Sequence, residues 1–252
     1  MIKAVFFDLS GVLFEGNTVI PGAVETINRL ENDGLVLRFV TNTARKTRKR
    51  LLEDLALMGF NILPEQLFTA PVAAKNWCLK HELKPYCLVH PDIKSEFADI
   101  HTDSGNAVVL GDAAQGLNYD NLDKAFNILI NGGHLIAIGD NRYFDSQGQL
   151  HLDAGPFVKA LEYAAGVSAT VTGKPSSAFF QEVIATTPFQ PEEILMVGDD
   201  VYGDIQGARH SGMEGWLVKT GKYRSGDELA LSFPVHTGND VRDVIRQRLP
   251  ML

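Results

Sequence analysis

Residues 4–12, AVFFDLSGV, are the most informative about the fold, because an unbroken apolar run leads directly into Asp8 and is followed by Ser10 and Gly11. A continuous run of this kind is typical of a strand buried on both faces of a parallel sheet. Amphipathic helical patterns separate further runs, and several of these patterns end at a glycine, a common helix stop. The alternation predicts an α/β fold with a doubly wound parallel sheet. The further runs are 35–40, 87–89, 107–110, 135–138, 169–172, 194–197 and 216–218.

Composition limits the class of protein. The chain has 252 residues, 45% hydrophobic and 21% charged, with a net charge of −8, which excludes a disordered, collagen-like or coiled-coil chain. An acidic chain is a poor ligand for nucleic acid or acidic membranes. Its two cysteines, Cys78 and Cys87, cannot build a disulfide framework or a cysteine zinc site. No apolar run approaches the about 18 residues of a membrane span, so we expect a cytoplasmic protein.

Polar side chains stand at the ends of the predicted strands, where open α/β sheets bind ligands. They supply carboxylates, a hydroxyl, an amide and an ammonium, which is the set needed to handle a phosphoryl group with a divalent cation. Each alone is weak evidence, since an aspartate at a strand end is often only a turn or helix cap. Their occurrence together, all at strand ends, favours a functional site. The residues are Asp8, Ser10, Thr41, Asn42, Lys174, Asp199, Asp200 and Asp204.

The acidic residues suit a nucleophile and a Mg²⁺ site. Asp8 can attack phosphorus and form an aspartyl-phosphate. Asp8 and Asp199 offer the oxygen ligands that Mg²⁺ prefers, and Ser10 can add its backbone carbonyl. We expect Asp200 and Asp204 to orient the groups around the metal.

The remaining candidates suit the phosphoryl group of a small substrate. Thr41 and Asn42 can donate hydrogen bonds to its oxygens, and Lys174 supplies a cation for the same oxygens and for Asp8. We place Leu9 and Ser10 beside Asp8 among the substrate-binding residues.

The motif series hhhDxSGV, hhhTN, GKP and hhGDDxxxD, in which h is an apolar residue, resembles the haloacid dehalogenase superfamily of phosphohydrolases. Segments along the whole chain, among them RFVTNT, GPFVKALEYA and VKTGKYR, are similar to its phospholysine phosphohistidine inorganic pyrophosphate phosphatase group. The resemblance implies that Asp8 is the nucleophile and a metal ligand, with Ser10 and Asp199 as further ligands. It implies that Thr41, Asn42 and Lys174 bind phosphate.

The resemblance also implies the organisation of the chain. Residues 1–71 and 168–252 would form the catalytic core, and residues 72–167 an inserted α/β cap. A homodimer is expected, because members of the family commonly dimerise. A polar stretch over residues 142–153, RYFDSQGQLHLD, is a candidate hairpin within the cap.

Ser10 departs from the superfamily, in which most phosphatases have an aspartate two residues after the nucleophile. That aspartate protonates the leaving group, and a serine hydroxyl is too weak an acid to do so. One hypothesis is therefore a Mg²⁺-dependent phosphohydrolase that acts on compounds with good leaving groups, such as pyrophosphate or N-phosphoryl groups. The alternative is a weakly active binding or regulatory protein of the same fold.

Other motifs carry less weight. Gly173-Lys174 lacks the upstream glycine of a phosphate-binding P-loop, and no G-x-S-x-G serine hydrolase motif is present. The basic run 45–50 is interpreted as a solvated face at the start of a helix, with a minor role in attracting anionic substrate.

Overall fold

The structure is a computed structural model that describes residues 1–146 and 149–250. The chain forms two compact units, the first made of residues 1–41, 49–68 and 174–252 and the second of residues 42–48 and 69–173. Each unit has its own sheet with helices packed on it, so the predicted α/β class is confirmed. The units are described separately below.

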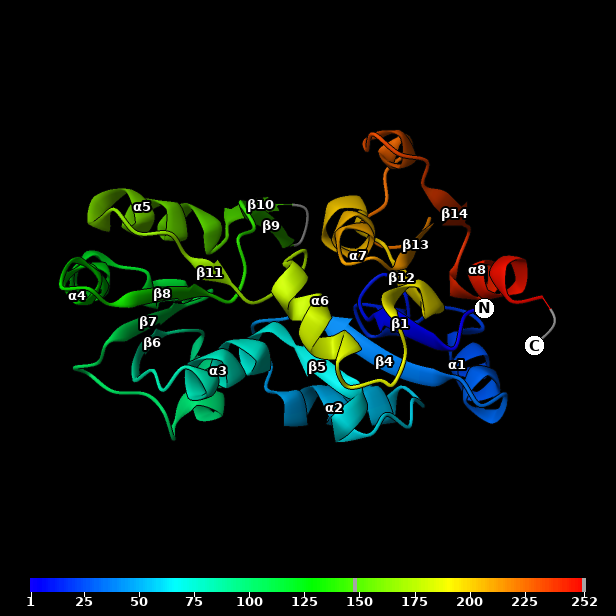
Figure 1. The fold of residues 1–252 in the computed structure, drawn as a ribbon, viewed down its shortest axis with the longest axis horizontal. Coiled ribbons are helices and arrows are strands. Elements are labelled where there is room, and N and C mark those ends of the chain that lie inside the picture. Colours follow the sequence, from blue (N-terminus) through cyan, green and yellow to red (C-terminus); the bar gives the residue numbers. More distant parts are fainter. Residues whose placement is uncertain (147–148, 251–252) are drawn as a thin grey trace. The chain divides into compact units, whose positions relative to one another are not determined.

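The first unit is built on a six-stranded sheet with the order β14-β13-β12-β1-β4-β5. From β1 the chain continues to β4 and β5 on one side, and it later returns to β12, β13 and β14 on the other (Figure 1). The strand order therefore reverses between β1 and β12, where a doubly wound sheet places its ligand crevice. The strands are β1 (Ala4–Asp8), β4 (Val36–Thr41), β5 (Leu67–Thr69), β12 (Ile194–Gly198), β13 (Glu214–Val218) and β14 (His236–Gly238).

The central strand β1 is buried along its whole length, as its apolar sequence predicts. It pairs in parallel with β12, where Phe7 lies opposite Val197, and with β4, where Asp8 lies opposite Val40. Strand β12 is buried throughout as well. The carboxyl ends of these two strands are therefore held side by side by backbone hydrogen bonds.

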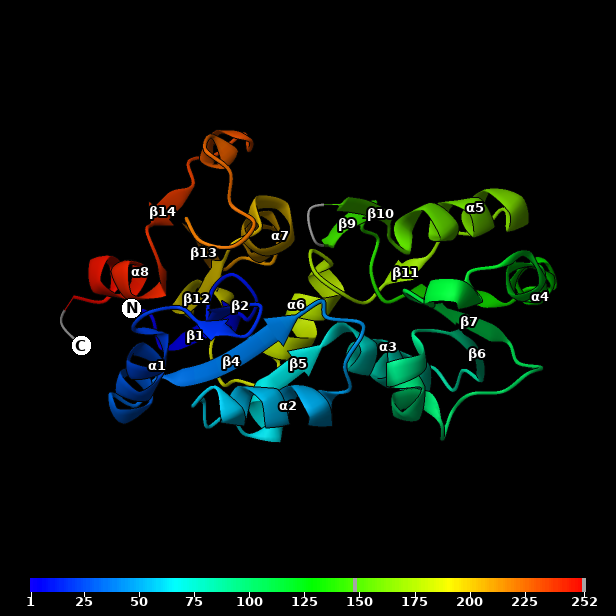
Figure 2. The same cartoon turned by 180° about the vertical axis from the view of Figure 1, so that it is seen from behind.

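Helices cover this sheet. Three of them, α1, α2 and α8, pack with β1, β4 and β12 into one apolar cluster, in which the rings of Phe7 and Phe39 stack at 5.9 Å. Helix α6 crosses in front of β4 and β5 in Figure 1 and lies behind them in the reverse view of Figure 2. The helices are α1 (Ala23–Asn32), α2 (Arg48–Leu57), α6 (Ser177–Ile184), α7 (Gly207–His210) and α8 (Val241–Arg248), and a short hairpin joins β2 (Phe14–Glu15) to β3 (Thr18–Val19).

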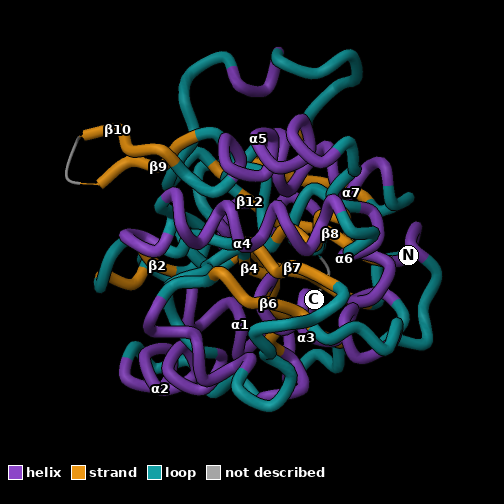
Figure 3. The backbone as a smooth tube through the Cα atoms, turned by 90° about the vertical axis from the view of Figure 1, so that its left-hand side faces the viewer, coloured by secondary structure: helices purple, strands orange, loops and turns teal. Residues whose placement is uncertain are grey.

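The second unit has a four-stranded parallel sheet with the order β11-β8-β7-β6 and a separate hairpin, β9–β10. Figure 3 draws the backbone of both units as a tube, with the strands of this unit and of the first in orange and the helices in purple. Its elements are α3 (Ala70–Lys80), β6 (Pro85–Leu88), β7 (Ala107–Leu110), α4 (Tyr119–Ile130), β8 (His134–Ala137), β9 (Tyr143–Ser146), β10 (Gln149–Leu152), α5 (Gly155–Ala165) and β11 (Thr170–Val171).

The polar stretch 142–153 forms the expected hairpin, with Phe144 opposite His151, although its residues 147–148 lie outside the described part of the chain.

The interpretation of the basic run 45–50 was wrong in one respect. Helix α2 begins only at Arg48, and Arg45 forms an ion pair with Asp112 instead of lying on a solvated helix face. Within residues 1–146 and 149–250, no helix is both long enough and apolar enough to cross a membrane.

Candidate active site

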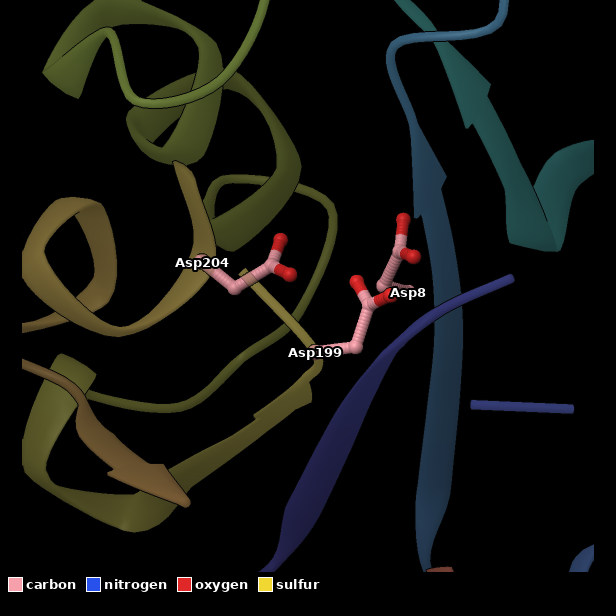
Figure 4. Close-up of side chains that lie close together, drawn as sticks. All are labelled: Asp8, Asp199 and Asp204. Carbon is pink, nitrogen blue, oxygen red and sulfur yellow. The ribbon is translucent and has the colours of Figure 1, made fainter. Parts of the chain in front are cut away.

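Three carboxylates meet at the carboxyl end of the first unit's sheet. Asp8 is the last residue of β1, Asp199 directly follows β12, and Asp204 lies in the π-helical turn Val201–Gln206. Each offers an oxygen, and these oxygens lie within 4.8 Å of one another. All three side chains are buried, and Figure 4 shows their carboxylates gathered around one region. Asp204, expected to orient groups around the metal, is thus a member of the cluster itself.

A buried lysine joins the cluster. Lys174 Nζ lies 2.5 Å from Asp8 Oδ1 and 2.6 Å from Asp204 Oδ1, and it also donates to the carbonyl oxygen of Val40 at 3.4 Å. Burial alone would lower the pKa of Lys174, but Asp204 and Asp8 outweigh it and raise that pKa above the ordinary value. Lys174 is therefore a fixed positive charge between two of the carboxylates.

The negative charge of the third carboxylate, Asp199, is balanced less fully. Burial, followed by the charges of Asp8 and Asp204, raises the pKa of Asp199 to about 7, although the backbone N–H of Lys222 donates to its Oδ2 at 2.8 Å. When all are ionised, three carboxylates against one buried ammonium leave two excess negative charges. A single divalent cation would balance them, and an all-oxygen donor set suits a hard ion such as Mg²⁺.

Asp200 has a local structural role. Its Oδ1 accepts the N–H groups of Tyr202 at 3.1 Å and of Gly203 at 2.8 Å, which caps the turn that carries Asp204. Its own N–H donates to Asp204 Oδ2 at 3.2 Å. Asp200 therefore holds Asp204 in place, as an aspartate before a helical turn commonly does.

Glycine is required where the loops approach Asp199. Gly11 has a φ of +85°, and a Cβ there would lie 2.0 Å from Asp199 Oδ2. Gly221 has a φ of +65°, and its Cβ would lie 2.2 Å from the same oxygen. Both loops can reach the carboxylate only without a side chain.

The other predicted residues differ in their placement. Thr41 ends β4 and is buried, whereas Ser10 is exposed. The side chain of Leu9 belongs to the apolar cluster, so only its backbone is available to a ligand. Asn42 belongs to the second unit, and its role in phosphate binding stays a prediction.

The end of β13 also belongs to the site, although it is not among the residues predicted from the sequence. Gly221 N–H donates to Glu15 Oε1 at 2.6 Å, Lys222 N–H donates to Asp199, and the Thr220 hydroxyl donates to the carbonyl oxygen of Gly11. The signal was available, because the run 216–218 was predicted as a strand and the polar residues Thr220 and Lys222 follow it closely.

Comparisons with known proteins identify the family to which this chain is related. The sequence model of the haloacid dehalogenase-like hydrolases matches residues 5–103, and a related HAD-hydrolase-like model matches residues 171–245. A phospholysine phosphohistidine inorganic pyrophosphate phosphatase of Danio rerio is 44% identical over 233 residues, covering 90% of this chain and 86% of that protein. Haloacid dehalogenase-like hydrolase domain-containing protein 2 of Bos taurus is 44% identical over 227 residues, covering 90% and 88%. Among solved structures, a 4-nitrophenylphosphatase of Thermotoga maritima has the same fold, with a TM-score of 0.88 at 23% identity, and the match covers 97% of each chain.

Proposed function

Because the chain belongs to the haloacid dehalogenase-like hydrolases and is a phosphatase of that family, we propose that it hydrolyses small phosphorylated compounds through a phosphorylated Asp8. The observation that carries the proposal is the buried group of Asp8, Lys174, Asp199 and Asp204 at the reversal point of the sheet. A carboxylate nucleophile beside a fixed ammonium is suited to attack on a phosphoryl group.

The reaction has two steps. An oxygen of Asp8 forms a bond to phosphorus as the leaving group departs with the electrons of its own bond. Water then attacks the phosphorus of the aspartyl-phosphate, which releases phosphate and restores the carboxylate. Lys174, which donates a hydrogen bond to Asp8 Oδ1 at 2.5 Å, orients the nucleophile and balances negative charge in both steps.

The residues fit a Mg²⁺ ion. Asp8 and Asp199, with the backbone carbonyl of Ser10, would hold it, and Asp204 would orient the surrounding groups. When bound, the ion would neutralise charge on the phosphoryl oxygens and on the carboxylates. Burial, followed by the charges of Asp8 and Asp204, raises the pKa of Asp199 to about 7, and the negative charge gathered there supports this assignment.

Ser10 narrows the substrates. Since it cannot protonate a leaving alkoxide, good leaving groups are favoured, such as phosphate from pyrophosphate or an amine from an N-phosphoryl compound. The printed name of the Danio rerio relative, a phospholysine, phosphohistidine and pyrophosphate phosphatase, supports the same class. Ser10 is also the one observation that favours the second candidate, a weakly active binding or regulatory protein. A cap formed by residues 72–167, a homodimer and a cytoplasmic location remain predictions.

The test is phosphate release from pyrophosphate, a phosphoramidate, an acyl phosphate and an alkyl phosphate, each with Mg²⁺ and with EDTA. We expect turnover of pyrophosphate or the phosphoramidate that EDTA abolishes. Phosphate binding without turnover of any of the four would favour the binding protein instead. Turnover unaffected by EDTA would contradict the metal assignment.

A further inference from the structure

We propose that Lys222 is an exchangeable cation of the active site: its ammonium pairs with the carboxylate of Asp200 when no divalent ion is bound, and turns to the phosphoryl group of the substrate once an ion is present. This inference rests on the proposed function and assigns a role to a residue outside the motif series. It makes Lys222 a determinant of both metal and phosphate affinity.

The backbone of Lys222 is fixed at the site. Its N–H donates to Asp199 Oδ2 at 2.8 Å, and the N–H of the preceding Gly221 donates to Glu15 Oε1 at 2.6 Å. Thr220 adds a hydrogen bond to the carbonyl oxygen of Gly11, next to the nucleophile loop. The backbone of Lys222 is therefore held beside the carboxylates, independently of the contacts that its ammonium makes.

The ammonium of Lys222 is held only weakly. Lys222 Nζ makes one long ion pair, 3.4 Å from Asp200 Oδ2, and its side chain is 69% exposed. Lys174, by contrast, is 5% exposed and bonded to two carboxylates. An exposed ion pair of this length is weak, so Lys222 can leave Asp200 at little cost. Lys174 is thus held tightly at the site and Lys222 weakly.

The ammonium of Lys222 lies beside the acidic cluster, 3.4 Å from Asp200 Oδ2, on a residue whose backbone N–H donates to Asp199. Like other lysine side chains, it is positively charged at neutral pH. A divalent ion and this ammonium are attracted by the same negative charge and repel each other. Once the ion has neutralised the carboxylates, the strongest remaining attraction for the ammonium is the phosphoryl group of the substrate.

Removing this charge should therefore have two effects of opposite sign. Lys222→Gln keeps the backbone hydrogen bond to Asp199 but loses the ammonium. Mg²⁺ should bind about two- to fivefold more tightly, because a repulsion through partly solvated space is removed. Inorganic phosphate, in saturating Mg²⁺, should bind about three- to tenfold more weakly, because a charge-assisted contact is lost. A general loss of structure would weaken the binding of both ligands, so it cannot produce shifts of opposite sign.

The experiment is isothermal titration calorimetry at low and at high ionic strength, with Mg²⁺ alone and then with inorganic phosphate in saturating Mg²⁺. Lys222→Arg should retain both wild-type affinities, because it keeps the charge. The matched control is Lys219→Gln, which removes an exposed lysine whose Nζ lies over the ring of Tyr223, 5.9 Å from its centroid. It should leave both affinities unchanged. Both effects of Lys222→Gln should shrink at high salt.

Any result other than opposite shifts in Lys222→Gln overturns the proposal, as does the same pattern in Lys219→Gln. These outcomes are separate from those of the proposed function. Wild-type protein that binds Mg²⁺ and phosphate but hydrolyses nothing would refute the hydrolase mechanism and leave the role of Lys222 open to the same titrations. Hydrolysis by the wild type, with unchanged affinities in Lys222→Gln, would support the hydrolase mechanism and refute the proposed role of Lys222.

Discussion

The metal-free protein should lose stability as the pH rises from 5 to 8, because of Asp199. Folding raises the pKa of this carboxyl to about 7, chiefly through burial and then through Asp8 and Asp204. The folded state therefore holds the proton more tightly than the unfolded chain does. The resulting stabilisation is present at low pH and is lost as the pH rises through the folded-state pKa.

The size of the effect follows from the two pKa values. With an ordinary aspartate pKa of about 3.9 in the unfolded chain and about 7 in the folded protein, the free energy of unfolding falls by about 2–3 kcal/mol between pH 5 and pH 8. For a chain of this length, that corresponds to a drop in Tm of about 4–10 °C. Saturating Mg²⁺ should remove most of the drop, because the cation supplies the charge that the proton had supplied.

Thermal unfolding followed by circular dichroism at pH 5, 6, 7 and 8, in EDTA and in Mg²⁺, measures this directly. Asp199→Asn is the control, because its amide does not titrate; its Tm should fall less than that of the wild type over the same range. A wild-type Tm in EDTA that rises with pH, or that parallels the Tm of Asp199→Asn, would refute the charge account of the site.

Three further predictions concern single residues. Lys174→Met leaves buried carboxylates without their ammonium and should lower the free energy of unfolding in urea by about 3–5 kcal/mol, whereas Lys3→Met at an exposed ion pair should cost under about 1 kcal/mol. Ser10→Asp should raise the turnover of alkyl phosphates relative to pyrophosphate, by up to about 10²-fold; a wild type that already prefers alkyl phosphates would contradict this account of Ser10. Gly221→Ala should weaken Mg²⁺ binding in calorimetry because its Cβ would meet Asp199, unlike the Cβ of Gly226→Ala, whose position also has a positive φ but no atom within 4 Å; equal losses in both would point to backbone strain alone.

The sequence was sufficient for the strands that form the centre of each sheet. The runs at 4–7 and 194–197 are buried on both faces, so their continuous apolar character identified them without ambiguity. Edge strands were harder to find: β14 (His236–Gly238) and β5 (Leu67–Thr69) are three residues long, and β14 begins with a histidine. Helix α3 (Ala70–Lys80) buries mainly small residues and lacks a clear amphipathic stripe, so its helical pattern is weak in the sequence.

For the site, the position of a residue at a strand end was informative, but its hydrogen-bond partners were not. Asp8 ends β1 and Asp199 follows the adjacent strand β12, so their meeting could be deduced from the doubly wound topology. That Asp204 joins the cluster, while Asp200 caps the turn carrying it, depends on the local geometry of residues 201–206. The contact of Lys222 with Asp199 joins residues 23 positions apart and has no periodic signal.

The role of Asp8 as the nucleophile is tested by comparing phosphate release by the wild type and by Asp8→Asn, with pyrophosphate and a phosphoramidate as substrates in saturating Mg²⁺. An amide cannot attack phosphorus to form the acyl-phosphate, so Asp8→Asn should release no phosphate above the uncatalysed rate. Its cooperative thermal unfolding would show that the fold is retained. Wild-type turnover in a folded Asp8→Asn protein would contradict the claim that Asp8 is the nucleophile.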